Sequence, residues 1–158
     1  ITGKSASSVV MNEGMRNGVI REPDARKLFE AITGKEVAEV GSFDHPTIIN
    51  TSASPDGLIR GENACLELKA PTHATHAKNL MQDTMPKNYV YQVQLQIACT
   101  ESDYAYFASY HPDFPKELRL KWVKVEKDDS IIKSLEEAIR QFDIEIEDLI
   151  IKIQKGAN

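Results

Sequence analysis

Apolar residues recur every three or four positions in several stretches of the chain, and this spacing predicts helices. One helix is predicted between Pro23, a residue favoured at helix starts, and Gly34, a residue favoured at helix ends. Residues 74–83 form a second predicted helix, and a third begins at Pro86. Stretches with a different periodicity lie between these helices, which indicates a mixed α/β chain.

The longest predicted helix follows Asp128, Asp129 and Ser130, which supply an N-terminal cap and acidic groups for the first turn. Its length of about 25 residues corresponds to roughly 37 Å at 1.5 Å per residue. Nine apolar residues form one stripe along it: Ile131, Leu135, Ala138, Ile139, Phe142, Ile146, Leu149, Ile150 and Ile153. We expect this stripe to pack on the sheet or on a neighbouring subunit.

Alternating or β-branched runs predict the strands. Residues 37–40 and 47–51 are β-prone and are separated by the loop GSFDHP, so we expect two strands of a meander there. Residues 104–110 and 118–125 alternate between apolar and polar positions and predict two further strands. No internal repeat and no linker interrupts the pattern, so residues 1–158 are expected to form a single domain.

A β-hairpin is predicted in the middle of the chain. Ser54-Pro55-Asp56-Gly57 has the composition of a turn in which glycine accepts a positive φ angle. The short run Leu58-Ile59, a turn at residues 60–63 and a strand at residues 64–70 complete the hairpin, and Pro71 ends it.

Glu67 and Lys69 lie on the same face of the second hairpin strand, because alternate residues of a strand share a face. Leu66 and Leu68 point to the opposite face and into the core, so we expect a half-buried strand. Asp56 precedes Glu67 by eleven positions (67 − 56 = 11) across the hairpin, which can bring the two carboxylates side by side. A lone Glu–Lys pair on a surface strand contributes little to stability and is common. The additional carboxylate of Asp56 is what indicates a functional site.

Two adjacent carboxylates repel each other unless a cation lies between them. Mg²⁺ binds a few oxygen ligands and keeps several waters, so Asp56 and Glu67 are suitable ligands and the carbonyl of Leu68 can add a neutral one. Lys69 can then orient a water molecule or stabilise the charge that develops on a phosphate. These residues predict metal-assisted hydrolysis of a phosphodiester, with Mg²⁺ as the cofactor and Mn²⁺ as a substitute.

Composition and charge limit the partners and the cellular compartment that we expect. The net charge of −5 argues against a broadly basic surface, so any residues that bind nucleic acid must be concentrated locally. Cys65 and Cys99 lie in apolar patterns and are expected to be buried, reduced thiols, which favours the cytoplasm. No apolar run approaches the roughly 18 residues of a membrane span, so no membrane partner is expected. The chain begins without an initiator Met, and we expect a truncated N-terminal segment.

Pro55-Asp56 followed by Glu67-Leu68-Lys69 resembles the PD-(D/E)XK nuclease superfamily. Longer blocks resemble its phage lambda exonuclease, or YqaJ-like, branch: REPDARKLFEAITG, TSASPDGLI with LELKAP, YVYQVQLQIACT and YAYFASYHPDF. Four blocks in the right order, between about residues 17 and 125, are more specific than the short motif. The resemblance implies a restriction-endonuclease-like α/β core, with a central mixed β-sheet flanked by helices and a long C-terminal helix.

The resemblance also implies an activity. It predicts a 5′-to-3′ exonuclease that acts on the ends of linear double-stranded DNA and leaves 3′ single-stranded tails for recombination. The partners it implies are DNA ends, a single-strand annealing protein and two further copies of the chain in a homotrimeric ring. By the same resemblance the protein is encoded by a phage or prophage and works in the cytoplasm of a bacterial host.

The roles of individual residues follow from the same family. The resemblance makes Asp56, Glu67 and the Leu68 carbonyl metal ligands, and Lys69 the catalytic lysine. It adds Glu22 as a further acid near the metal, and Gln92 as a catalytic residue that positions Lys69 or the phosphate. The residues that we expect to contact DNA are Tyr89, Arg16 and Arg21.

Two other functions use the same residues. An endonuclease or junction-resolving enzyme would share the short motif, and a catalytically inactive DNA-binding module would keep only the fold. A zinc site is not expected, because His73 and His76 lack a third ligand at suitable spacing and are interpreted as surface residues. His45 and His111 precede prolines and are interpreted as loop residues.

Overall fold

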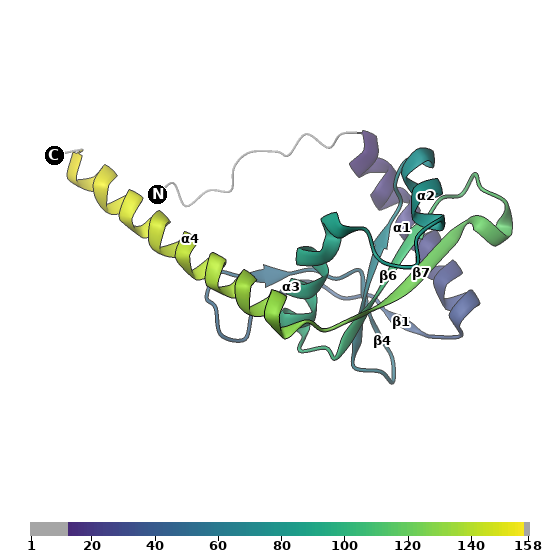
Figure 1. Cartoon of the computed structure of the whole chain (residues 1–158), viewed down its shortest axis with the longest axis horizontal. Helices are drawn as coiled ribbons and strands as arrows, with labels where there is room; N and C mark the ends of the chain where they lie inside the picture. Colours follow the sequence, from purple (N-terminus) through teal and green to yellow (C-terminus); the bar gives the residue numbers. More distant parts are fainter. Residues whose placement is uncertain (1–12, 157–158) are drawn as a thin grey trace.

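The computed structural model describes residues 13–156, with side chains for residues 18–155 (Figure 1). Its elements are α1 (Glu13–Thr33), β1 (Val37–Ala38), β2 (Phe43–Asp44), β3 (Ser52–Ala53), β4 (Gly57–Ile59), β5 (Ala64–Lys69), α2 (His73–Leu80), η1 (Lys87–Tyr89), α3 (Val90–Thr100), β6 (Tyr104–Tyr110), η2 (Lys116–Leu118), β7 (Leu120–Glu126) and α4 (Asp129–Gly156). Predictions that concern residues 1–12 lie outside the described part.

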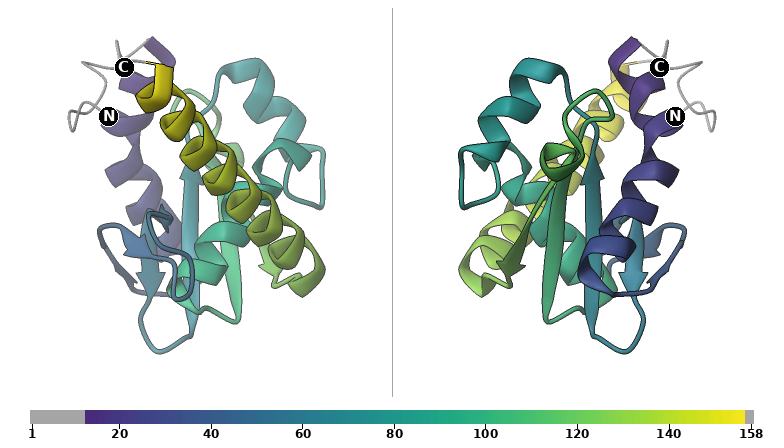
Figure 2. Two further views of the ribbon diagram at one scale, coloured as in Figure 1. Left: turned by 90° about the vertical axis from the view of Figure 1, so that its left-hand side faces the viewer. Right: turned by 90° about the vertical axis from the view of Figure 1, so that its right-hand side faces the viewer.

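A five-stranded sheet in the order β1-β4-β5-β6-β7 forms the centre of the structure. β5 and β6 are parallel, whereas β1–β4, β4–β5 and β6–β7 are antiparallel. The crossover from β5 to β6 contains α2, η1 and α3, so the carboxyl ends of these two strands lie at the same edge of the sheet. The strands stand between α1 and α2 (Figure 2). The predicted fold, a mixed sheet flanked by helices with a long C-terminal helix, is confirmed.

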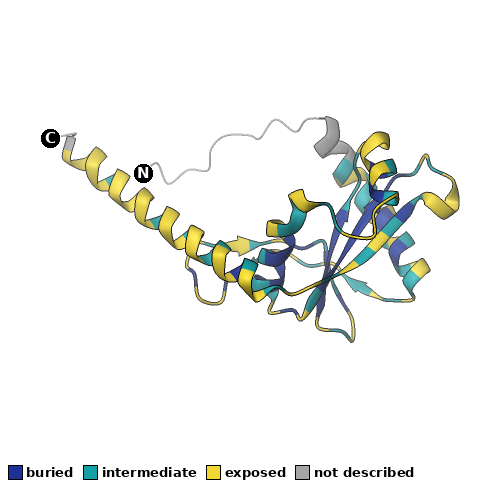
Figure 3. Cartoon of the chain, in the orientation of Figure 1, coloured by how far each residue is buried: buried dark blue, intermediate teal, exposed yellow. Residues whose placement is uncertain are grey.

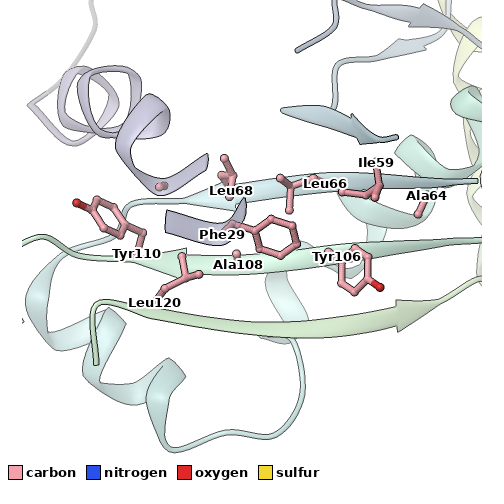
Figure 4. Packing of buried hydrophobic residues seen from close by; sticks show 10 residues of the cluster. Phe29, Ile59, Ala64, Leu66, Leu68, Tyr106, Ala108, Tyr110 and Leu120 are labelled. Atoms are coloured by element: carbon pink, nitrogen blue, oxygen red, sulfur yellow. The ribbon is translucent and has the colours of Figure 1, made fainter. Parts of the chain in front are cut away.

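Both faces of β5 are buried. On one face Leu66 and Leu68 pack with Phe29 of α1 and with residues of β6 (Figure 4). On the other face Cys65 packs with Val93 and Ile97 of α3. The prediction of a half-buried strand is therefore wrong, and the residues that share a face with Cys65 lie beneath a helix.

α1 begins ten residues before Pro23, at Glu13, and the predicted start at Pro23 is wrong. Proline is favoured in the first turn of a helix, but here it lies inside one, where it lacks an N–H to donate. The predicted end is confirmed, because Gly34 has a φ of +70° and its N–H bonds to the carbonyl of Glu30 at 2.8 Å.

The segment between α1 and β4 differs from the predicted meander. Residues 47–50 form a turn, and the second sheet pairs Phe43–Asp44 with Ser52–Ala53. Gly57 does not have a positive φ; it begins β4, and an added Cβ would collide with Val37 of β1. Glycine is favoured here because the side chain of Val37 occupies the space that a Cβ would take, and the carbonyl oxygen of Ala38 would lie only 3.1 Å from it.

The long helix α4 comprises 28 residues, and only its first part is covered. Ile132 is buried against α3, whereas the distal half extends away from the sheet (Figure 1) and is largely exposed (Figure 3). Phe142, for example, is 60% exposed. The stripe therefore does not pack on the sheet along its whole length, and a neighbouring subunit remains a predicted partner. No helix within residues 13–156 is long and apolar enough to span a bilayer.

Candidate active site

The β4–β5 hairpin places Asp56 against β5. Gly57 pairs with Leu66 in the register, and the N–H of Asp56 continues the ladder by donating to the carbonyl of Leu66 at 2.9 Å. The Oδ2 atom of Asp56 accepts a 2.6 Å hydrogen bond from the N–H of Leu68. Asp56 thus bonds to the backbone on both sides of Glu67, through its own N–H on one side and its carboxylate on the other.

Glu67 is only 1% exposed, yet both of its carboxylate oxygens have partners. Gln92 donates to Oε1 at 2.7 Å, and Gln96 donates to Oε2 at 2.5 Å. The ammonium of Lys69 also forms an ion pair with Oε1. The acid and the lysine share this face because they form a buried cluster beneath α3, where an unpartnered carboxylate would be very costly.

The charge around Asp56 indicates a place for a cation. Burial and the nearby negative charge of Glu67 raise the pKa of Asp56 to about 7, a change that the N–H of Leu68 and the charge of Lys69 oppose. The charge of Glu22 adds to the increase in this pKa. A divalent cation among these oxygens would relieve the repulsion between the carboxylates, so the donor set fits Mg²⁺.

Glu22 lies on α1 and is connected to Asp56 by Arg26, a residue that the sequence analysis missed. Arg26 donates to Oε1 of Glu22 at 2.6 Å and to the backbone carbonyl of Asp56 at 3.2 Å. Its other terminal nitrogen bonds to Glu39 at 2.6 Å. Side chains four residues apart in a helix can pair, but the predicted helix began at Pro23 and left Glu22 outside it, so this signal appears only once α1 is extended to Glu13.

Gln96 was missed as well. It lies four residues after Gln92, hence on the same face of α3, and is fully buried. In addition to Glu67 it contacts the carbonyl of Ser54 at 3.2 Å, so it links β5 to the segment that leads to Asp56. Among the described residues its own carbonyl oxygen, Oε1, has no hydrogen-bond partner, which leaves one more oxygen beside the carboxylates.

Tyr89 lies next to the catalytic candidates. Its ring is 5.3 Å from the ammonium of Lys69 and packs on Phe107 at 5.2 Å between ring centroids. Arg21 instead contacts the ring of His111 at 3.2 Å, beyond the end of β6, and no contact with Asp56 or Glu67 is found for it in the described part. Arg16 belongs to α1, but its side chain lies outside the described residues.

His76 differs from its predicted surroundings. His76 is fully buried, where it bonds to the hydroxyl of Ser109 and to the carbonyl of Leu118, both at 2.8 Å. His45 and His111 lie in loops as predicted, although both are buried, and His73 is exposed as predicted. His76 was misread because α2 packs its inner face on β6, a tertiary contact that the short helix does not reveal.

Comparisons with known proteins identify the family of this chain. The profile of the YqaJ-like viral recombinase domain matches residues 1–103. The alkaline exonuclease LHK-Exo from Laribacter hongkongensis has a TM-score of 0.88 at 34% sequence identity, over 93% of this chain and 75% of its own. Its complex with dAMP gives a TM-score of 0.89 at 34% identity, over 94% and 75%.

A phage related exonuclease from Haemophilus somnus 129PT has a TM-score of 0.77 at 15% identity, over 96% of this chain and 78% of its own, and shares the fold. No curated protein matches the chain in sequence. The profile match covers most of the chain, and the match to LHK-Exo nearly all of it. The chain therefore belongs to the YqaJ-like viral recombinase family, a lambda exonuclease-like branch of the PD-(D/E)XK nucleases.

Proposed function

We propose that this chain is a Mg²⁺-dependent exonuclease that degrades one strand of linear double-stranded DNA from 5′ to 3′ and leaves 3′ single-stranded tails for recombination. The observation that carries the proposal is the position of Asp56 beside β5 at Glu67, with Lys69 in contact with Glu67. LHK-Exo supports it, since that exonuclease binds dAMP, a mononucleotide of the kind that an exonuclease releases.

Asp56, Glu67 and the Leu68 carbonyl would hold the cation, and Glu22 would stand near it. When bound, a divalent cation supplies positive charge against the phosphate and activates water. Arg26 fixes Glu22 relative to the backbone of Asp56, and Gln96 fixes Glu67. The chain thereby holds its acids in place before any cation arrives, which lowers the cost of reorganisation during the reaction.

Lys69 contributes the positive charge of the protein itself. Its ammonium is partly exposed and lies between Glu67 and the ring of Tyr89, so it is held in place by both and still reaches solvent. In this position it stabilises negative charge on a phosphate at the mouth of the site. Gln92 bonds to Glu67 from the more exposed end of α3 and can position that phosphate through its amide.

The partners belong to the same proposal. We expect a homotrimeric ring around the DNA, a single-strand annealing protein that receives the 3′ tail, and a role in the cytoplasm of a phage-infected bacterium. The exposed apolar stripe of α4 is compatible with a subunit contact. Sedimentation of the purified chain tests the trimer separately from the chemistry.

Digestion of a 5′-phosphorylated linear duplex tests the activity, with a label at either the 5′ or the 3′ end of one strand. We expect early release of the 5′ label as mononucleotide, late release of the 3′ label, and loss of both activities in EDTA with recovery in Mg²⁺ or Mn²⁺. A covalently closed circle should stay intact.

Three results would contradict the proposal. Nicking of the closed circle would favour an endonuclease or junction-resolving enzyme, which shares the short motif. Binding of duplex without cleavage would favour an inactive DNA-binding module. Persistent cleavage in EDTA would remove the metal from the mechanism.

A further inference from the structure

A second group of metal-ligating side chains lies outside the acidic site. His73 is the first residue of α2, His111 directly follows β6, and Asp113 lies in the turn after it. β5 and β6 are parallel and end at the same edge of the sheet, and α2 begins four residues after Lys69, the last residue of β5. The topology therefore brings the three residues together from segments that are about 40 positions apart.

The ligand atoms are close enough to share one ion. His73, His111 and Asp113 each offer one nitrogen or oxygen atom, and all three atoms lie within 4.8 Å of one another. Nε2 of His73 is 3.1 Å from Oδ2 of Asp113, and Nδ1 of His111 is 3.9 Å from the same oxygen. The centroids of the two imidazole rings are 3.9 Å apart.

The burial of the three residues suits a site that is fixed on one side and open on the other. His111 is 1% exposed and its ring lies against Phe114, at 5.6 Å between ring centroids. The side chains of His73 and Asp113 are 66% and 61% exposed, so an ion can enter from solvent and keep water ligands. A buried, immobile ligand reduces the entropy that binding costs.

We propose that His73, His111 and Asp113 form a transition-metal site, best matched to Zn²⁺, that is separate from the acidic site of Asp56 and Glu67. Two imidazole nitrogens and one carboxylate oxygen are donors that Zn²⁺ binds readily, with water in the open position. Mg²⁺ prefers an all-oxygen set, so the two sites select different ions. Zn²⁺ here would tie the start of α2 to the end of β6, close to Lys69.

Arg21 competes with the ion for His111. Its guanidinium is 3.2 Å from Nε2 of His111, and the N–H of Asp113 points at Nδ1 of the same ring at 3.3 Å. A neutral imidazole has one acceptor nitrogen, so it can accept only one of these two bonds. An ion bound to Nδ1, the nitrogen that faces Oδ2 of Asp113, would displace the Asp113 N–H and leave the proton on Nε2. That proton and the charge of the ion would both repel Arg21, which would have to rotate away.

Titration of the full chain with Zn²⁺ in excess Mg²⁺, followed by calorimetry, tests the site. We expect one Zn²⁺ per chain in the wild type, at least tenfold weaker binding in His73→Ala and Asp113→Asn, and unchanged binding in Glu117→Gln, an exposed acid nearby. Arg21→Gln should bind Zn²⁺ more tightly than the wild type, because the competing charge is gone. Both His73 and Asp113 are exposed, so their variants should keep the fold, which circular dichroism checks.

Histidine NMR supplies the second readout. Zn²⁺ should shift the ring signals of His73 and His111 most strongly and leave those of His45 in place, with only a smaller change at His76, whose ring lies 6.2 Å from that of His111. Zn²⁺ binding that survives His73→Ala, or binding that Asp56→Asn abolishes while His73→Ala does not, would overturn the proposal. Nuclease activity plays no part in this test, so its outcome is independent of the proposed function.

Discussion

The two faces of β5 carry opposite chemistry under similar burial. On one face Leu66 and Leu68 fill the core beneath α1; on the other, Glu67 and Lys69 lie beneath α3 with Gln92 and Gln96. Apolar packing explains the first face completely. The second face pairs a buried carboxylate with a partly exposed lysine, although hydrophobic residues of similar size would often be equally stable in place of such a pair. The first face therefore serves stability, and we propose that the second serves chemistry.

The largest effect that tests this division is expected at Lys69. Replacing Lys69 by Ala removes the ammonium next to Glu67 and should slow DNA cleavage about 10²- to 10³-fold, the usual cost of one charge-stabilising group. Mg²⁺ binding, measured by calorimetry, should change little. The readout is initial cleavage rate of a linear duplex.

Lys124 provides the matched control. Its ammonium also lies over a tyrosine ring, 4.0 Å from the centroid of Tyr104, and pairs with a neighbouring acid, Glu126. Lys124→Ala should cleave DNA at nearly the wild-type rate. An equal loss in both variants would mean that Lys69 acts as a general surface charge.

The next effect separates the two faces directly. Leu66→Ala should lower the free energy of unfolding by about 2–5 kcal/mol, since it leaves a cavity beneath α1. Glu67→Gln should change this free energy less and abolish cleavage. Urea unfolding and the cleavage assay, applied to both variants, measure the contrast. Similar stability losses together with similar activity losses would show that the faces are not functionally distinct.

A smaller effect is expected at Gln96. Gln96→Leu keeps the size of the side chain but removes the donor to Oε2 of Glu67 and to the Ser54 carbonyl, so the free energy of unfolding should fall by about 1–3 kcal/mol. The affinity for Mg²⁺ and the cleavage rate should fall as well, because only Oε1 of Glu67 is then held, by Gln92 and Lys69. Urea unfolding and calorimetry measure the two changes.

Gln94, two residues earlier on α3, serves as its control. It is equally buried, donates to the carbonyl of Glu126 and accepts from the N–H of Asp128, both at 2.9 Å. Gln94→Leu should destabilise the fold and leave Mg²⁺ affinity unchanged. If Mg²⁺ affinity falls equally in both variants, Gln96 has only a structural role.

The smallest expected effect is a pH dependence of the stability of the metal-free protein. The pKa of Asp56 is raised to about 7 in the fold, so its proton is bound more tightly in the folded than in the unfolded chain. The stabilisation that protonated Asp56 contributes is therefore fully present below the pKa of this group in the unfolded chain. It is lost as the pH rises towards and through 7. Thermal unfolding in EDTA should show this loss, and Asp56→Asn should remove it. A steeper loss in the variant would contradict the assignment.

The sequence predicted those parts of the fold and of the candidate site that depend on residues close to one another in the chain. The hairpin, the register that opposes Asp56 to β5 at Glu67, and the capped start of α4 at Asp128 all follow from local patterns. Gly34 ends α1 as expected for a glycine with positive φ. In these cases the local preference and the tertiary structure agree.

The parts that failed depend on contacts between distant segments. Pro23 is a good first helical residue, yet α1 continues before it. His76 was assigned to the surface because nothing in its own helix shows that α2 packs on β6. Arg26 and Gln96 were missed because their roles come from bonds to Asp56 and Glu67, which lie about 30 residues away in sequence.

Gly57 lies between the acidic site and β1, one of the two edge strands of the sheet. A methyl group at this position would strike Val37, and β1, the strand to which Val37 belongs, is only two residues long. Position 57 is next to Asp56 in the chain, so the displacement caused by a bulkier residue there would also move the carboxylate of Asp56. Loss of bulk at position 37 could relieve that collision, and the two positions are therefore expected to vary together among homologues.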